Sequence, residues 1–470
     1  MTSTDLADVS ATDLVRLYRR KAASPVEAAR ACLARIDRLN GRFGAFCLVD
    51  AEGALAGARA AEARWQAGAP LGPVDGVPTS IKDLHVVKGW PTRRGSRTTE
   101  GDPVGAEDAP AVGRLRAGGA VLLGKTTTPE FGWKGVTDNP LGEVARNPYD
   151  PSRTAGGSSG GAAVAAALGM GALHIGSDGG GSIRIPSGFS GIVGIKATFG
   201  RVAAWPASLF GTLSHVGPMT RTVADTALML STIAGFDSRD WLALPDDGVD
   251  YRIGLDGGVR GLRIAFSPDL GHARVDPAVA AAVAAAVQAL AEQGAVVETV
   301  DPGIGPSSAT FDPIWFAGTA AILDAMPAEK RGLVDPGMQR LAARGAALSS
   351  VELQRAAKAR AEMAIRLQRL HDRYDILVTP TLPIGAFAAG REVPEGSGMA
   401  EWMEWTPFSY PFNLSQQPAA TVPCGLTPDG LPIGIQLVGA KYADALVLRV
   451  ARAVESAVPM PKPPVLRADG

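Results

Sequence analysis

The sequence predicts an α/β fold: a single domain with a central mixed, largely parallel β-sheet covered by helices on both faces. Short apolar segments of strand length alternate with helix-length segments, and this order favours strands joined by crossover helices. Hydrophobic residues make up 46% of the 470 residues and charged residues 20%, which is enough apolar material for a sizeable core. No linker divides the chain, so we expect one sheet to take strands from both halves.

Helical segments dominate the first 70 residues. Ser24-Pro25-Val26-Glu27 is a capping box with proline at the first helical position, which predicts a helix start. Farther on, Gly118-Gly119 ends a helical segment, and the apolar run that follows is typical of a buried strand. The helices expected in this half lie within 10–40 (two helices), 51–68, 110–117 and 160–169, and the strands near 73–83, 120–125 and 172–177.

The pattern starts again after residue 235. A strand over 261–266, a helix that Asp276-Pro277 opens and Gly294 closes, and a strand over 295–300 form a βαβ unit. The other elements expected in this half are a capped helix over 349–373, a strand over 375–379 and a long Gly-, Pro- and aromatic-rich excursion over 385–412.

Charge and cysteine content narrow the class of protein. Lys and Arg total 46 against 47 Asp and Glu, and this balance argues against nucleic acid or an anionic membrane as a partner. The three cysteines are far apart and odd in number, which is typical of a reducing compartment. Residues 1–14 contain acidic residues and no apolar run, so we expect no signal peptide and a cytoplasmic protein.

Glycine and serine gather in two runs, Gly156–Gly161 and Gly176–Ser182, whose serines Ser158 and Ser182 lie 24 residues apart. Either run alone is typical of a tight turn between helix and sheet. Glycine also lets a ligand or another backbone approach closely, so both runs together favour a functional site.

Three functions fit such runs. Residues 156–160 match the G-x-S-x-G nucleophile elbow, but that motif needs a preceding strand and residues 147–151 are turn-like. A phosphate cradle lacks its G-x-x-x-x-G-K-[ST] pattern. The third function is a hydrolase in which two serines cooperate, with the bare amides of 179–181 beside Ser182 to stabilise an oxyanion.

Such a hydrolase needs a base. The five histidines are scattered without metal-ligand spacing, so we expect neither metal nor cofactor, and His174 is predicted to be a core histidine. Lys82 follows the apolar segment 77–81, where burial could lower its pKa. A lysine that titrates near 10.4 must be shifted down by roughly 2–3 units to act as a base at neutral pH.

The two runs and their flanks resemble the amidase signature family. The resemblance spans nearly the whole chain, and its central motif is highly specific. The matching segments are Gly76–Asp83, Asn147-Pro148, Gly156–Gly161, Gly176–Pro186, Gly194–Lys196, Pro423–Gly425, Asp429–Pro432 and Gly434–Gly439.

The resemblance implies an amide hydrolase with a Ser–cis-Ser–Lys triad and an acyl-enzyme intermediate. Ser182 would be the nucleophile, Ser158 the bridging serine behind a cis Gly157–Ser158 peptide, and Lys82 the base. The backbone of Gly179, Gly180 and Gly181, with the Ser182 amide, would form the oxyanion hole.

Three further signature residues are expected to support the triad. Asp178 and Arg184 are interpreted as an orienting charge pair, and Ser159 either supports the triad or caps a turn. In this interpretation residues 1–70 are N-terminal helices, 71–235 the signature core and 236–470 the part that forms the substrate pocket.

Aromatic residues are the expected walls of that pocket, since loops over a rigid sheet often carry specificity. They favour bulky, apolar or aryl amides as substrates, with ester, carbamate or hydrazide side activity. The candidate substrate-binding residues are Phe131, Trp133, Trp205, Phe210, Trp315, Phe316, Trp405 and Gln416.

Two other functions stay open from the sequence. One is the A subunit of a glutamine-dependent tRNA amidotransferase, which would use the same triad and require a partner protein. The other is a non-catalytic glycine-loop binding protein. For the hydrolase itself the expected partners are a small-molecule amide and water, without nucleic acid or membrane, in a monomer or homodimer.

Overall fold

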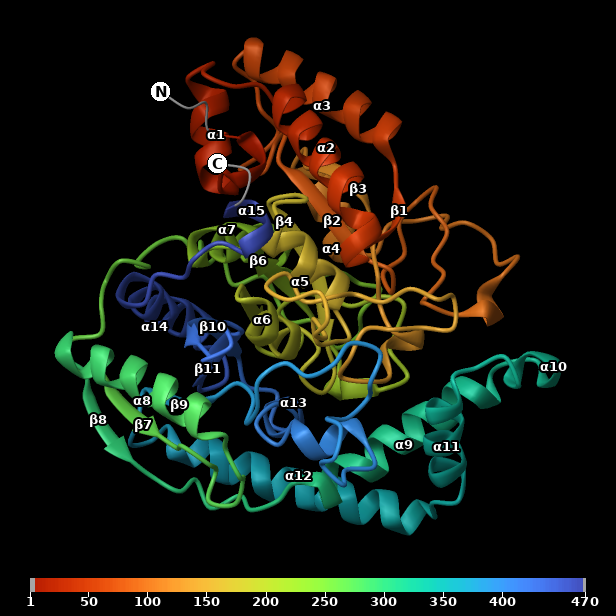
Figure 1. Cartoon of the computed structure of the whole chain (residues 1–470), viewed down its shortest axis with the longest axis vertical. Coiled ribbons are helices and arrows are strands. Elements are labelled where there is room, and N and C mark those ends of the chain that lie inside the picture. The colour runs from red at the N-terminus through yellow and green to blue at the C-terminus, as the bar shows by residue number, and fades with distance from the viewer. Residues whose placement is uncertain (1–4, 468–470) are drawn as a thin grey trace.

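One mixed sheet runs through the molecule (Figure 1). The computed structural model describes residues 5–467, and over this range the sheet has 11 strands. They are β1 (Phe46–Val49), β2 (Pro78–Lys82), β3 (Val121–Thr126), β4 (Leu173–Asp178), β5 (Val193–Lys196), β6 (His215–Thr220), β7 (Arg263–Phe266), β8 (Val296–Thr299), β9 (Ile376–Pro380), β10 (Ala419–Leu426) and β11 (Pro432–Gly439). Their order across the sheet is β1-β3-β2-β4-β6-β5-β10-β11-β9-β7-β8.

Helices cover the sheet, and the predicted α/β class is confirmed. Strands β3, β4, β6, β9 and β11 are buried at every residue, which requires cover on both faces because side chains alternate between them. The helices are α1 (Ala11–Arg19), α2 (Pro25–Phe43), α3 (Ala51–Gln66), α4 (Pro110–Ala117), α5 (Gly160–Ala167), α6 (Arg184–Ser190), α7 (Val223–Ile233), α8 (Pro277–Glu292), α9 (Ser308–Asp324), α10 (Ala328–Arg331), α11 (Pro336–Ala346), α12 (Ser350–Leu370), α13 (Pro411–Leu414), α14 (Asp444–Ala457) and α15 (Pro464–Arg467).

Among the 11 strands of the described sheet, parallel pairing occurs in two blocks. Strands β3, β2 and β4 form one block and β9, β7 and β8 the other. The strands between the blocks pair antiparallel, partly because β10 and β11 form a hairpin around residues 427–431. The alternation of helices and strands in the sequence therefore predicts the two blocks but not the antiparallel segment that joins them.

The apolar interior has two large parts. In one, the sheet packs against α7, α8 and α14, and in the other, aromatic residues of α9 and of residues 402–412 pack together. Helices α1–α3 lie at one end of the molecule and α9–α12 at the other (Figure 1). Among the helices described, none is long and apolar enough to cross a membrane. Residues 1–4 of the segment predicted to lack a signal peptide lie outside the described range.

Small residues let α5 pack closely on the neighbouring backbone. Every residue of α5 is buried, and it begins directly after Ser158 and Ser159. A Cβ on Gly161 would lie 2.4 Å from the Thr127 nitrogen and 2.5 Å from the Ala45 oxygen. Only glycine therefore lets α5 come this close to the neighbouring backbone. This packing places the turn with Ser158 and Ser159, called the serine turn below, against the end of β2 and β3.

Candidate active site

Lys82 is the last residue of β2, in the middle of the first parallel block. Its strand pairs with β3 on one side and β4 on the other, and Lys82 itself lies opposite Thr126. All five residues of β2 are buried, so the sheet carries the lysine side chain into the interior. Parallel strands end at the same edge, which brings Lys82 next to the end of β4.

The side-chain nitrogen of Lys82 contacts three serine hydroxyls. Its Nζ lies 2.7 Å from Ser158 Oγ, 2.9 Å from Ser159 Oγ and 3.0 Å from Ser177 Oγ. Ser159 Oγ in turn donates to the Ser177 carbonyl oxygen at 3.1 Å. The hydroxyl proton of Ser159 is thus engaged by the backbone.

The turn that carries Ser158 has the predicted cis Gly157–Ser158 peptide. Gly157 lies tightly against the chain, because a Cβ there would be 2.5 Å from the carbonyl carbon and oxygen of Val136. This close approach explains the glycine before the serine. The turn then leads directly into α5, which fixes Ser158 and Ser159 on the sheet side of that helix.

Ser182 lies in the loop between β4 and α6 and is joined to the serine turn through the backbone. The Ser159 amide donates to the Ser182 carbonyl oxygen at 3.1 Å. Within the described chain the Ser182 hydroxyl makes no hydrogen bond, and the residue is 6% exposed. The loop therefore holds Ser182 against the turn that carries Ser158 and Ser159, with its hydroxyl uncommitted.

Burial decides the protonation of the site. It lowers the pKa of Lys82 well below the usual 10.5, and the carboxylate of Asp178 offsets only part of that effect. Burial also lowers the pKa of His85 and of His174 to about 3. His174 is fully buried and bonded to Ser80 Oγ at 2.7 Å, as predicted for a core histidine.

Residues 179–183, between β4 and α6, form the glycine loop, and the peptide unit between Gly180 and Gly181 is held on both sides. Ser409 Oγ donates to the Gly180 carbonyl oxygen at 2.6 Å, and the Gly181 amide donates to Asp178 Oδ1 at 2.8 Å. The prediction that Gly181 supplies an oxyanion donor is therefore corrected, because its N–H already has an acceptor. Over the described residues the amides of Gly179, Gly180 and Ser182 have no acceptor.

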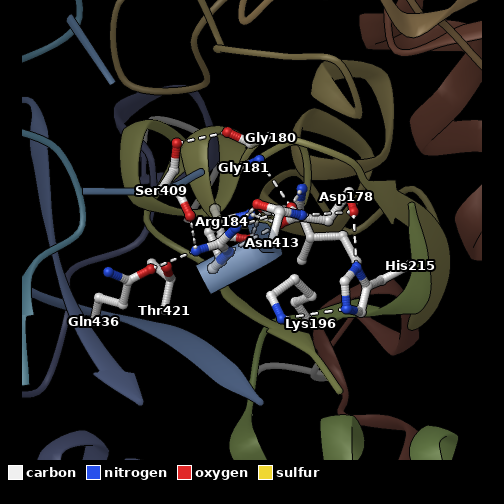
Figure 2. Close-up of polar contacts among 12 residues, drawn as sticks. Asp178, Gly180, Gly181, Arg184, Lys196, His215, Ser409, Asn413, Thr421 and Gln436 are labelled. Carbon is white, nitrogen blue, oxygen red and sulfur yellow. Dashed lines mark hydrogen bonds and ion pairs between the residues drawn. The ribbon is translucent and has the colours of Figure 1, made fainter. Parts of the chain in front are cut away.

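Asp178 and Arg184 form the buried charge pair expected from the signature (Figure 2). Arg184 Nε and Nη2 donate to the two carboxylate oxygens, each at 2.9 Å, and neither side chain is exposed. Burial alone would raise the pKa of Asp178, but the charge and hydrogen bonds of Arg184 outweigh it and hold that pKa below 3.8. The pair thus anchors the glycine loop in its charged form.

Three residues from the C-terminal half complete this network, and sequence reasoning missed their role. Asn413 Nδ2 donates to Asp178 Oδ1 at 2.8 Å, while Arg184 Nη1 donates to Gln436 Oε1 at 2.7 Å and to the Ser409 carbonyl at 2.8 Å (Figure 2). Ser177 was missed as well, although its place at the end of β4, beside Lys82, follows from parallel pairing.

Replacing Ser409 with alanine is expected to lower kcat about 10- to 100-fold and to leave KM nearly unchanged. Without its hydrogen bond, the peptide unit between Gly180 and Gly181 would be less firmly held, and so would the neighbouring amides that have no acceptor. Steady-state kinetics on a chromogenic amide checks this. Ser231→Ala is the matched control, since its hydroxyl also bonds a backbone carbonyl, that of Ala227, at 2.8 Å. An equal fall in kcat in both variants would contradict a role of Ser409 in holding the glycine loop.

A cavity of about 490 Å³ opens beside Ser177. That volume suits a small-molecule ligand. Of the predicted wall residues, Phe131, Trp205 and Phe210 line it. Most of the residues that line it precede residue 236, and residues within 322–330 supply the rest.

The other predicted wall residues do not line this cavity. Trp133, Trp315, Phe316 and Trp405 are buried in the aromatic part of the core, where large rings pack on one another. Trp315 stacks on Phe210 with ring centroids 3.9 Å apart and lies against Gly179, where a Cβ would be 3.1 Å from its ring. Gln416 instead donates to the Thr212 carbonyl and accepts from Lys441.

This fold, with a buried lysine among serines and a charge-anchored glycine loop, is that of the amidase signature enzymes, and the chain belongs to the amidase family. A family model described as Amidase matches residues 27–448. The protein is accordingly an amide-hydrolysing enzyme.

Two relatives and one solved structure illustrate the similarity. The chain is 40% identical over 466 residues to an acylamidase of Rhodococcus erythropolis, covering 98% of this chain and 97% of the relative. It is 38% identical over 472 residues to the A subunit of the glutamyl-tRNA(Gln) amidotransferase of Anaeromyxobacter sp. (strain K), covering 94% and 95%. A bacterial aryl acylamidase of the amidase signature family superposes with a TM-score of 0.90 at 29% identity, over 96% of both chains.

Proposed function

We propose that the protein hydrolyses bulky, apolar or aryl amides through an acyl-enzyme on Ser182. Ser182 Oγ attacks the amide carbonyl carbon while its proton passes to Ser158 and the Ser158 proton passes to neutral Lys82. The proton then returns to the leaving amine as the C–N bond breaks. Water attacks the acyl ester by the same relay and releases the acid.

The observation that carries this proposal is the contact of Lys82 with three hydroxyls. A neutral amine has two N–H donors and one lone pair, so one of the three hydroxyls must donate to it. Ser159 is excluded as that donor because its proton is given to the Ser177 carbonyl. Ser158 has the shortest contact, 2.7 Å, and its neighbour's amide bonds the Ser182 carbonyl. These contacts favour a relay through Ser158.

The amides of Gly179, Gly180 and Ser182 are the proposed oxyanion donors. They lie on the loop that Asp178 and Ser409 hold, and no described residue accepts from them. Donors fixed before the reaction need no reorganisation as negative charge develops on the substrate oxygen.

The cavity wall favours an apolar substrate body. Phe131, Trp205 and Phe210 present rings, and Ala203, Leu209 and Ile322 add aliphatic surface. The similarity to an acylamidase and an aryl acylamidase supports the same substrate class.

A second candidate function is the A subunit of a glutamine-dependent tRNA amidotransferase, which the similarity at 38% identity favours. The purified chain is expected to cleave anilides faster than glutamine, because glutamine offers no apolar body to the cavity. A panel of glutamine, aliphatic amides, anilides, esters and carbamates measures this preference. Glutaminase activity above anilide cleavage, with copurification of a second protein, would instead establish the amidotransferase function.

A further inference from the structure

Two strained residues form one wall of the cavity. Arg94 has φ 52° and Phe131 φ 50°, and both line the cavity. The Phe131 amide donates to the Arg94 carbonyl oxygen at 2.8 Å, so the two left-handed residues stabilise each other. Non-glycine residues are uncommon in this conformation, and they gather at ligand sites and active sites.

The Arg94 guanidinium has no partner among the described residues, although the residue is half-buried. Lys330 lines the same cavity and donates to the Thr98 carbonyl oxygen at 2.7 Å, which uses one of its three N–H groups. The only carboxylate among the lining residues belongs to Asp102, which is exposed. The half-buried part of this wall is therefore cationic, and Arg94 and Lys330 both have N–H groups that no described residue accepts from.

This wall is close to the reacting groups. Gly132 directly follows Phe131, and a Cβ on Gly132 would lie 3.2 Å from Ser158 Oγ. Ser177, which contacts Lys82, lines the same cavity. A substrate that reaches Ser177 and Ser158 from this cavity would therefore place its remaining atoms beside Phe131 and Arg94.

We propose that Arg94 binds a carboxylate on the substrate, so that the preferred substrates are amides whose apolar body also carries an anionic group. The planar guanidinium matches a carboxylate with two parallel hydrogen bonds, and Lys330 adds a second positive charge. This inference rests on the proposed function and specifies its substrate class.

Matched substrate pairs test it. Glutaryl and pentanoyl p-nitroanilides have acyl chains of equal length and differ in the carboxylate, and 4-acetamidobenzoate and acetanilide differ in the same way on the amine side. In one pair the wild-type enzyme should prefer the anionic member. Arg94→Gln should lower kcat/KM for that member about 10- to 100-fold and change the neutral member less than about twofold.

Arg93→Gln is the matched control. It removes the same positive charge from the neighbouring residue, whose side chain does not line the cavity. It should leave both rates within about twofold of wild type. Thermal denaturation checks that each variant is folded. Absence of any anionic preference in both pairs, or an equal fall for both members in Arg94→Gln, would overturn the inference and leave the amidase function intact. Failure of the proposed function would look different, since the wild type would then cleave none of the four compounds.

Discussion

Replacing Lys82 with methionine is expected to lower kcat for amide hydrolysis about 10²- to 10⁴-fold, the usual contribution of a general base. Methionine fills a similar volume but can neither accept the relayed proton nor return it to the leaving amine. Kinetics on a chromogenic anilide measures the loss, and circular dichroism checks the fold. Lys82→Arg is the informative companion, because a guanidinium stays charged and should not restore activity.

The wild-type enzyme should lose activity as the pH falls through the lowered pKa of Lys82, since only the neutral amine accepts a proton. His85 and His174 titrate near pH 3, so they contribute no acidic limb above pH 5. Stability should change with pH as well. Between the lowered pKa and about 10.4 the unfolded chain binds more protons, so the free energy of unfolding rises with pH in that window. A flat rate profile down to pH 5 would contradict a lysine base.

Breaking the Asp178–Arg184 pair is expected to destabilise the protein by about 3–5 kcal/mol, because either single substitution leaves an unpaired buried charge. Urea denaturation of Arg184→Met measures the loss, and activity should fall with it as the glycine loop loses its anchor. Lys358→Met is the control: its pair with Glu362 lies at the surface, with side chains 81% and 54% exposed, and should contribute less than about 1 kcal/mol.

The pH dependence of stability from this pair has the same sign as that from Lys82 but falls in a lower pH window. The folded pKa of Asp178 lies below its unfolded value of about 3.9, so its stabilising contribution is present above that value and is lost as the pH falls through the folded pKa. A single Arg184→Met variant as stable as wild type would show that the charge pair is not the anchor inferred above.

Local sequence signals predicted much of the fold. The capping boxes at Ser24 and Ser349 both open helices, because a cap depends only on residues within one turn. The position of Lys82 beside Ser158 was predicted through the family resemblance, and the strand that buries the lysine was visible in the sequence. In contrast, Ser409 and Asn413 reach Asp178 and the glycine loop from more than 200 residues away, and no local pattern marks them.

The aromatic residues predicted to line the substrate pocket show why other predictions did not match the structure. An aromatic residue in a loop has the same sequence signature whether it faces a cavity or a core. Phe210 and Trp315 stack on each other, yet only Phe210 lines the cavity. Arg94 went unnoticed for a related reason: its importance lies in the absence of a partner, which only the folded arrangement reveals. Tertiary packing, rather than residue type, separates these roles.

The identity of the nucleophile is the central claim, and covalent labelling tests it most directly. A fluorophosphonate probe reacts with an activated serine, and peptide mapping by mass spectrometry locates the adduct. The account predicts a single adduct on Ser182, absent from Ser182→Ala and slowed in Lys82→Met. An adduct on Ser158 or Ser159, or undiminished labelling of Ser182→Ala, would contradict it.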